Sequence, residues 1–216
     1  KIFDEILVNA ADNLMRDPEG MDTIKVDIDA KAQTISVLNN GKGLPVVIHK
    51  EHKVYIPELV FGHLLTSDNY NDADGKVVGG RNGYGAKLAN IFSQKFTVET
   101  ADGQKTFTQH FEKNMTKRHE PEVANSKEKS FTRITFKPDL AKFGMSTLDD
   151  DVVSLFTKRV YDIAGTSGSR CTVHLDGKKL PVKSFVDYCG LFHAGEGHVH
   201  QHFGKRWEVL VARSDG

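Results

Sequence analysis

A glycine-rich stretch in the first half of the chain carries the residue types that bind phosphate. Residues 79–88 read GGRNGYGAKL, and glycines let the backbone approach an anion and turn its N–H groups toward it. The stretch departs from the P-loop pattern, because Ala86 displaces Lys87 by one position and Leu88 stands where a hydroxyl would hold magnesium. If this loop binds phosphate, the metal ligand must come from another part of the chain.

Two other interpretations of this loop stay open. The dinucleotide pattern G-x-G-x-x-G occurs here in reversed order, as Gly80, Gly83 and Gly85, although Glu99 lies near the distance expected of a ribose-binding acid. A glycine turn that merely links a loop to a helix is the second interpretation. The phosphate cradle gains support from the helix expected to begin near Tyr84, because its positive end and a lysine in its first turn would face the anion.

The start of the chain offers the missing metal ligand. Apolar residues recur there at helical spacing, which predicts a helix over residues 1–16. Glu5 and Asn9 would then lie on one face of this helix, one turn apart. A glutamate can act as a general base toward water, and an asparagine oxygen suits a Mg²⁺ ion that also binds phosphate. An ordinary solvated helix face is the alternative interpretation.

The order of the remaining elements predicts an α+β fold. Strands are expected over 23–28, 34–38, 96–100, 105–111, 133–137 and 171–175, and helices over 57–64, 84–92 and 149–164. Leu155 is expected to face inward from the last of these helices. Because a helix comes first and mostly sheet comes after it, a mixed or antiparallel sheet is favoured over βαβ winding. Residues 66–83 form a polar loop of a length that is usually functional or mobile.

Composition and charge limit the functional classes. The 216 residues are 38% hydrophobic, enough for one substantial core or for one domain with part of a second. Lys+Arg and Asp+Glu both number 29, so the chain lacks the basic surplus of a nucleic-acid module. Cys171 and Cys189 match no metal-binding spacing and indicate a reducing compartment. No long apolar run or signal peptide is visible, so no membrane association is expected.

The C-terminal part differs in composition from the rest. Glycine and histidine dominate residues 193–204, which predicts a linker or loop and a domain boundary near Leu191. The histidines are His193, His198, His200 and His202. Their alternating spacing can capture zinc, but without a cysteine partner or an acidic second shell nearby we expect a solvated loop. Residues 207–211 read as a strand with nothing after it to pair with, so we expect a piece of a longer protein.

Three motifs succeed one another in an order that is specific to a family. Glu5-x-x-x-Asn9 precedes N-x-G-x-G at 39–43 and G-x-x-G-x-G at 80–85, which resembles the ATP-binding fold shared by DNA gyrase, Hsp90-type chaperones, histidine kinases and MutL. The strings KIFDEILVNAADN, NNGKGLPV, LLTSDNY and GGRNGYGAKLANIFS look like the ATPase region of eukaryotic-type DNA topoisomerase II. The resemblance continues through ITFKPDLAKF, RVYDIAGT and RWEV and covers nearly the whole chain.

The resemblance implies a fold and a set of site residues. The fold is a two-layer α/β sandwich of the gyrase/Hsp90 type, with helices on one face of a mixed, mostly antiparallel sheet and ATP between helix and lid. Glu5 would polarise the attacking water and Asn9 would ligate Mg²⁺. Asn39 would accept a hydrogen bond from the adenine amino group, at a position where relatives commonly carry Asp. Asn13 would lie at the nucleoside end of the same helix.

The remaining nucleotide contacts implied by the resemblance come from the loop. Ser67, Asp68 and Asn69 would line the ribose and phosphates from the lid, and Gly80, Arg81, Asn82, Gly83, Tyr84, Gly85, Ala86 and Lys87 would wrap the triphosphate. Asp68 departs from the family pattern, which has a second serine there. An acid beside phosphates is unfavourable unless it faces away from them or contacts the sugar.

The resemblance also implies a function. Residues 1–191 would be the ATP-binding domain without its N-terminal arm, and residues 192–216 a linker with the first strand of the transducer domain. The full-length enzyme would be a homodimeric type II DNA topoisomerase of the nucleus, or of a DNA-containing organelle, that hydrolyses Mg·ATP to close a dimer gate and pass one DNA duplex through another.

This chain would lack both the arm and the transducer lysine that contacts the terminal phosphate. It would therefore bind Mg·ATP, hydrolyse it weakly and stay largely monomeric. The alternative is an ATP-binding interaction module, related to chaperones, that binds ATP and recruits partners without significant hydrolysis.

Overall fold

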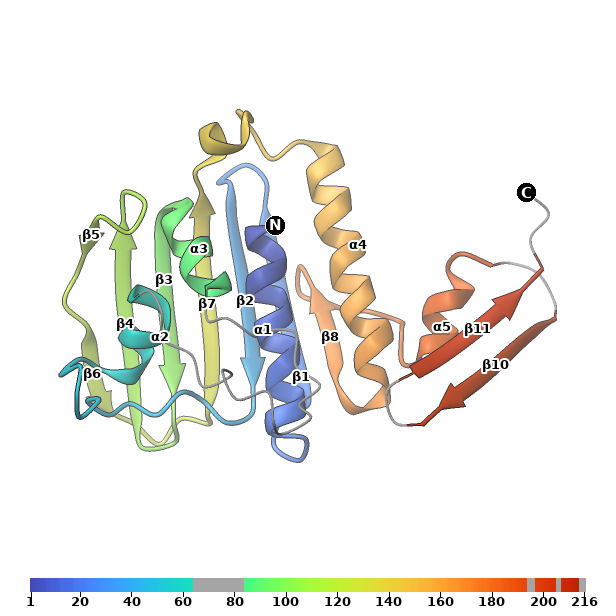
Figure 1. Ribbon diagram of the computed structural model, residues 1–216, viewed down its shortest axis with the longest axis horizontal. Helices are drawn as coiled ribbons and strands as arrows, with labels where there is room; N and C mark the ends of the chain where they lie inside the picture. The colour runs from blue at the N-terminus through green and yellow to red at the C-terminus, as the bar shows by residue number, and fades with distance from the viewer. Residues whose placement is uncertain (64–83, 194–196, 205–206, 214–216) are drawn as a thin grey trace.

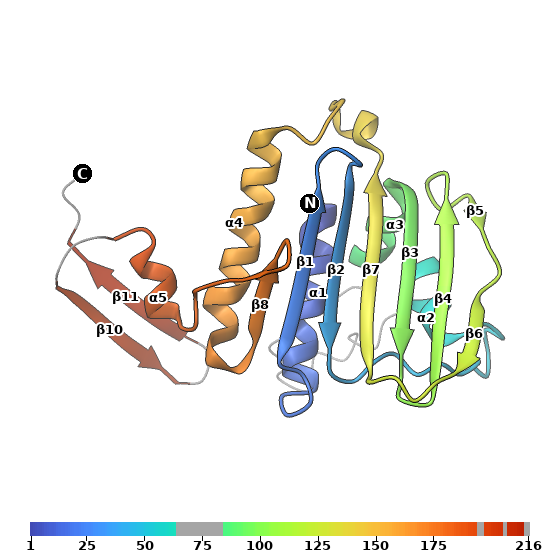
Figure 2. The same ribbon diagram turned by 180° about the vertical axis from the view of Figure 1, so that it is seen from behind.

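The computed structural model of the chain describes residues 1–63, 84–193, 197–204 and 207–213. Within them, a layer of helices covers one face of a long sheet (Figure 1). The view from behind shows that the opposite face of this sheet carries none of the described helices (Figure 2). The predicted two-layer sandwich with helices on one face is therefore confirmed.

The main sheet has nine strands in the order β5-β4-β3-β7-β2-β1-β8-β9, with β6 also paired to β4. They are β1 (Thr23–Asp29), β2 (Thr34–Asn40), β3 (Ser93–Ala101), β4 (Lys105–Glu112), β5 (Lys117–Arg118), β6 (Glu122–Asn125), β7 (Phe131–Pro138), β8 (Thr172–Leu175) and β9 (Lys178–Lys179). The β1–β8 pair is parallel, whereas the other pairs between these described strands are antiparallel. The predicted mixed, mostly antiparallel sheet is confirmed.

The helices are α1 (Ile2–Arg16), α2 (Ile56–Gly62), α3 (Gly85–Ile91), α4 (Asp150–Ser167) and α5 (Phe185–Gly190), with short 3₁₀ turns η2 (Leu140–Phe143) and η3 (Gly168–Arg170). Pro57 in the first turn of α2 has a φ already suited to a helix and has no N–H to leave unpaired. Asp149 caps α4, because its side chain accepts a hydrogen bond from the Val152 N–H at 3.0 Å. None of the described helices is long and apolar enough to cross a membrane.

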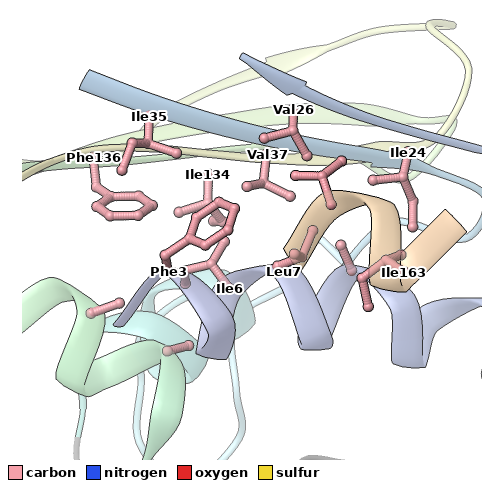
Figure 3. Packing of buried hydrophobic residues seen from close by; sticks show 14 of the residues in the cluster. Phe3, Ile6, Leu7, Ile24, Val26, Ile35, Val37, Ile134, Phe136 and Ile163 are labelled. Atoms are coloured by element: carbon pink, nitrogen blue, oxygen red, sulfur yellow. The ribbon is translucent and has the colours of Figure 1, made fainter. Parts of the chain in front are cut away.

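The core lies between α1 and the centre of the sheet. Figure 3 shows Phe3 and Leu7 of α1 pointing into the apolar residues of the sheet, which include Val37 of β2 and Ile134 of β7. Phe3 also stacks on Phe156 of α4, with ring centroids 4.4 Å apart. Since the apolar stripe of α1 faces the sheet, the face that carries Glu5 and the asparagines is turned away from the core.

Some predictions about the sandwich need correction. Leu155 is 57% exposed and does not face inward, because the buried residues of α4 lie in its C-terminal half, from Val160 onward. The segment between β4 and β7, predicted as a charged loop, contains β5 and β6. Both are short strands of mostly exposed residues on the edge of the sheet, so hydrophobic alternation did not reveal them.

The histidine-rich segment is a strand, which corrects the prediction of a loop there. β10 (His198–Phe203) pairs with β11 (Trp207–Ala212) in a separate two-stranded sheet. The partner of residues 207–211 therefore precedes them in the chain, whereas the prediction considered only a partner on their C-terminal side. The alternating pattern H-V-H-Q-H-F has the period of a strand, but its polar imidazoles and flanking glycines favour a loop when only local composition is considered.

Candidate functional site

Helix α3 begins directly beside the carboxylate of Glu5. A Cβ built on Gly85, the first residue of α3, would lie 2.1 Å from Glu5 Oε2, so a side chain there would displace the Glu5 carboxylate. Helices α1 and α3 pack together on the same face of the sheet (Figure 1). The sequence hypothesis required the first helix to face the end of the glycine loop, and the described residues have this arrangement.

The exposed face of α1 is polar from its first turn to its end. The Lys1 ammonium lies 2.9 Å from Glu5 Oε1, and the hydrogen bond to Glu5 raises the pKa of Lys1. Asn9 and Asn13 are half-buried at successive turns beyond Glu5. Asn13 Nδ2 donates to the Asn40 carbonyl oxygen at 3.4 Å, so this face reaches the end of β2.

Asn39 lies where the helix-facing row of β2 changes from apolar to polar. Ile35, Val37 and Asn39 are all buried at alternate positions, so Asn39 shares the face that packs against α1. Its Nδ2 donates to the Asn40 carbonyl oxygen at 3.0 Å. Within the described part of the chain no donor is paired with its Oδ1. That oxygen can accept a hydrogen bond from a ligand.

The predicted site omitted Thr132, which is paired directly with Asn39 across β2 and β7. Residues directly opposite in a sheet point to the same face, so Thr132 joins Asn39 at the polar end of the core. Its hydroxyl lies 3.1 Å from that of Thr100, which is 1% exposed and donates to the Phe131 carbonyl oxygen. A polar residue that ends the alternating row of Ile134 and Phe136 is the signal that sequence reasoning overlooked.

The turn after Asn39 is held against both layers. The Lys42 N–H donates to Asp17 Oδ2 at 2.6 Å, which fixes the turn to the end of α1. A Cβ on Gly43 would lie 1.9 Å from the Ala101 carbonyl oxygen, so glycine is required for this close approach. Asp17, just after α1, is therefore a positioning residue that the sequence analysis did not single out.

Lys87 is buried in the first turn of α3. Its side chain is 1% exposed, and burial lowers its pKa to about 8. A lysine in such surroundings gains from an anion that stabilises its charged form. Of the neighbouring predicted residues, Ala86 is buried and Tyr84 is exposed.

The other predicted loop residues lie outside the described residues. These are Ser67, Asp68, Asn69, Gly80, Arg81, Asn82 and Gly83, all within 64–83. The structure therefore brings together Glu5, Gly85, the two asparagines of α1 and the end of β2. The chemical roles of these residues stay predictions.

Comparison with known proteins shows which family this chain belongs to. The chain belongs to the histidine kinase-, DNA gyrase B-, and HSP90-like ATPase family, whose model matches residues 1–142. Among solved structures it is similar to the ATPase region of Saccharomyces cerevisiae topoisomerase II, with a TM-score of 0.95, 49% identity, and coverage of 100% of this chain and 58% of that one.

A more distant structure shares the fold. It is the 43K ATPase domain of Thermus thermophilus gyrase B in complex with an aminocoumarin, with a TM-score of 0.68, 22% identity, and coverage of 94% of this chain and 54% of that one.

Curated relatives narrow the similarity to one group of proteins. DNA topoisomerase 2 top-2 of Caenorhabditis elegans is 53% identical over 224 residues, and DNA topoisomerase 2 of Arabidopsis thaliana is 52% identical over 228 residues. Each alignment covers 100% of this chain but 15% of the relative. The chain thus spans a small part of the length of the proteins that it matches.

Proposed function

We propose that this chain is the ATPase region of a type II DNA topoisomerase and that Glu5 is its general base. The observation that carries the proposal is the contact between the Glu5 carboxylate and Gly85 at the start of α3. Support comes from the identity of more than half over the whole chain with DNA topoisomerase 2 proteins.

The adenine would lie at the end of β2. Asn39 offers its side-chain carbonyl oxygen to the exocyclic amino group, and Thr132 beside it offers a hydroxyl. Asn13 lines the same end of α1 and is oriented by its bond to the Asn40 carbonyl oxygen. The polar end of an otherwise apolar core suits a flat base with one hydrogen-bonding edge.

The phosphates would lie between α1 and the start of α3. The backbone N–H groups of Gly85, Ala86 and Lys87 belong to the first turn of α3, where they have no partner within the helix. Lys87 adds a cation. We assign the remaining triphosphate and lid contacts to Ser67, Asp68, Asn69, Gly80, Arg81, Asn82, Gly83 and Tyr84, as the family resemblance implies.

Asn9 would ligate Mg²⁺. Its side-chain oxygen is a hard, neutral ligand, one helical turn from Glu5 and on the same face of α1. When bound, Mg²⁺ supplies positive charge that offsets the phosphate oxygens. Glu5 accepts the proton of the attacking water, and its contact with Gly85 keeps the carboxylate at the phosphate end of the site.

The proposal extends to the whole protein. Residues 1–191 form the ATP-binding domain, and residues 192–216 a linker with the opening of a transducer domain. The full-length protein would be a nuclear homodimer that couples Mg·ATP turnover to the passage of one DNA duplex through another. The 216-residue chain by itself would be largely monomeric and would hydrolyse ATP weakly.

Glu5→Gln tests the base assignment, because it keeps the size of the side chain and removes its basicity. We expect residual ATP hydrolysis to fall by at least about a hundredfold, while the affinity for a non-hydrolysable ATP analogue with Mg²⁺ changes little. Glu19→Gln, an exposed acid after α1, serves as the matched control. Loss of binding in Glu5→Gln would show that the carboxylate is not the base.

Two further measurements test the rest of the proposal. Asn9→Ala should remove most of the Mg²⁺ dependence of analogue binding, and unchanged dependence would move the metal elsewhere. A separate measurement on the full-length protein tests the link to DNA. Duplex DNA should stimulate ATP hydrolysis there. ATP binding without turnover at any chain length would instead favour the interaction module.

A further inference from the structure

The two faces of the C-terminal hairpin differ in chemistry. Side chains alternate along β10, so His198, His200 and His202 share one face, whereas Val199 and Phe203 point to the other. His202 is paired with Glu208 across the hairpin, so this carboxylate joins the histidine face. The neighbouring strand therefore supplies a carboxylate to the histidine face.

Three ligand atoms converge on this face. His200 Nε2 lies 2.7 Å from Glu208 Oε1, and His202 Nε2 lies 3.6 Å from the same oxygen. The two imidazole rings meet edge to face, with centroids 5.0 Å apart. All three ligand atoms lie within 4.8 Å of one another. Two imidazoles and a carboxylate form a donor set that binds zinc and similar divalent transition metals.

We propose that His200, His202 and Glu208 bind a divalent transition metal, zinc above all, that crosslinks β10 and β11. Zinc bonds of about 2.0–2.2 Å place tetrahedral ligand atoms about 3.3 Å apart. The present separations reach this geometry through small side-chain rotations, without a change of strand register. In the metal-free chain the His200–Glu208 hydrogen bond occupies the same point, and the metal replaces the bridging proton.

The surroundings of the cluster favour a bound cation. The His200 and Glu208 side chains are 26% and 32% exposed, so both are partly shielded from water, whereas His202 is 66% exposed and leaves an entry path. The ring of Phe185 in α5 lies 6.5 Å from that of His200 and shields one side.

A metal here would stabilise a hairpin that makes few contacts with the other described elements. Isolated two-stranded hairpins are marginally stable in water, and Val199 and Trp207 on the other face are 70% and 71% exposed. A crosslink formed only in the folded state adds its binding free energy to folding. The site would therefore act as a structural clamp at the beginning of the segment after the sandwich.

The experiment is a zinc titration of the tag-free chain after chelator treatment, followed by calorimetry. We expect one zinc per chain, with weakening of at least about tenfold in His200→Ala and in Glu208→Gln. The control Gln201→Ala lies on the same strand but on the opposite face and should bind as the parent does. His49→Ala removes another close histidine pair, with ring centroids 4.9 Å apart, and should also leave the binding unchanged.

Trp207 is the single tryptophan of the chain, so its emission reports on the hairpin directly. The emission should change at one equivalent of zinc in the parent and not in Glu208→Gln. If His200→Ala disrupts the hairpin, the metal-free emission shows it, and the near-isosteric Glu208→Gln then decides. Equal zinc affinity of the parent and Glu208→Gln, or loss of binding only in His49→Ala, would overturn the proposal.

Discussion

The sandwich and the C-terminal hairpin are both built from strands, but they bury their apolar side chains to very different extents. In the sandwich, Phe3 and Phe136 are 1% exposed, because α1 lies across the central strands. In the hairpin, Val199, Trp207 and Val211 are 70%, 71% and 64% exposed. Both regions carry a cluster of polar side chains on their strands. In the sandwich the cluster lies where the core ends, and in the hairpin it occupies one face of the strands.

The difference shows what holds each candidate site in place. Asn39 and Glu5 lie on elements fixed by a continuous core, so their geometry does not depend on a ligand. The histidine face of the hairpin lies on two strands that contact the rest of the chain mainly through α5. We therefore expect substitutions in the sandwich to have large effects without any ligand, and the hairpin to respond most to what binds it.

The largest expected effect comes from truncating an aromatic residue in each region. Phe3→Ala should lower the free energy of unfolding by about 3–5 kcal/mol, because it leaves a cavity under α1 and removes the stack on Phe156. Phe203→Ala, at a position 52% exposed, should cost less than about 1 kcal/mol. Urea denaturation of both variants measures the contrast. Similar losses would mean that the hairpin is buried in solution.

Substitutions of two glycines compare a crowded position at the candidate site with an open position near the hairpin. Gly85→Ala should cost about 1–3 kcal/mol by overpacking against Glu5 Oε2, and should weaken nucleotide binding by displacing α1 from α3. Gly190→Ala, at the end of α5, meets no atom within 4 Å and should be nearly neutral. Thermal unfolding and analogue titration of both variants test this. Unchanged binding in Gly85→Ala would contradict the close contact.

The link between the two regions should give a somewhat smaller effect. Asp162 of α4 accepts hydrogen bonds from Tyr188 of α5 and from Lys158 and Arg159. Asp162→Asn should cost about 2 kcal/mol at neutral pH through lost charge-assisted hydrogen bonds. The experiment compares the unfolding midpoints of the parent and the variant.

The effect of Asp162→Asn should also depend on pH. Burial alone would raise the pKa of Asp162, but the bonds from Tyr188, Lys158 and Arg159 outweigh it and the pKa lies below its usual value. The stabilisation is therefore present above the pKa of an unfolded aspartate and is lost as the pH falls through the lower folded value. The difference in unfolding midpoint between the parent and Asp162→Asn should disappear at acidic pH. A difference that stays constant with pH would show that the ionisation of Asp162 is not linked to folding.

The smallest expected effect is a pH dependence of nucleotide affinity. Burial lowers the pKa of Lys87 to about 8 in the nucleotide-free chain, and a nearby phosphate would raise it again. Binding then takes up a proton above about pH 8, so the affinity should fall by about tenfold between pH 7 and pH 9. Lys87→Met should bind more weakly at pH 7 and lose this dependence. An affinity that is flat with pH in the parent would place Lys87 away from the phosphates.

Local patterns in the sequence determined α1, most of the main sheet and the candidate site residues, but they did not reveal the exposed strands β5, β6 and β10. The apolar stripe of α1, the alternating strands and the glycine-rich motifs predicted a helix with a base and a metal ligand, a mostly antiparallel sheet and a phosphate loop. These features depend on residues within a few positions of one another. The spacing of apolar residues and the residue types in turns are therefore enough to predict them.

Tertiary structure alone decided which residues meet. The contact of Glu5 with Gly85 depends on how two helices pack on one sheet, and the pairing of Asn39 with Thr132 depends on the register of β2 and β7. The carboxylate beside the histidines likewise comes from the neighbouring strand of a hairpin. Register and helix packing are set by long-range contacts and the burial of a shared core, which no local pattern in the chain encodes.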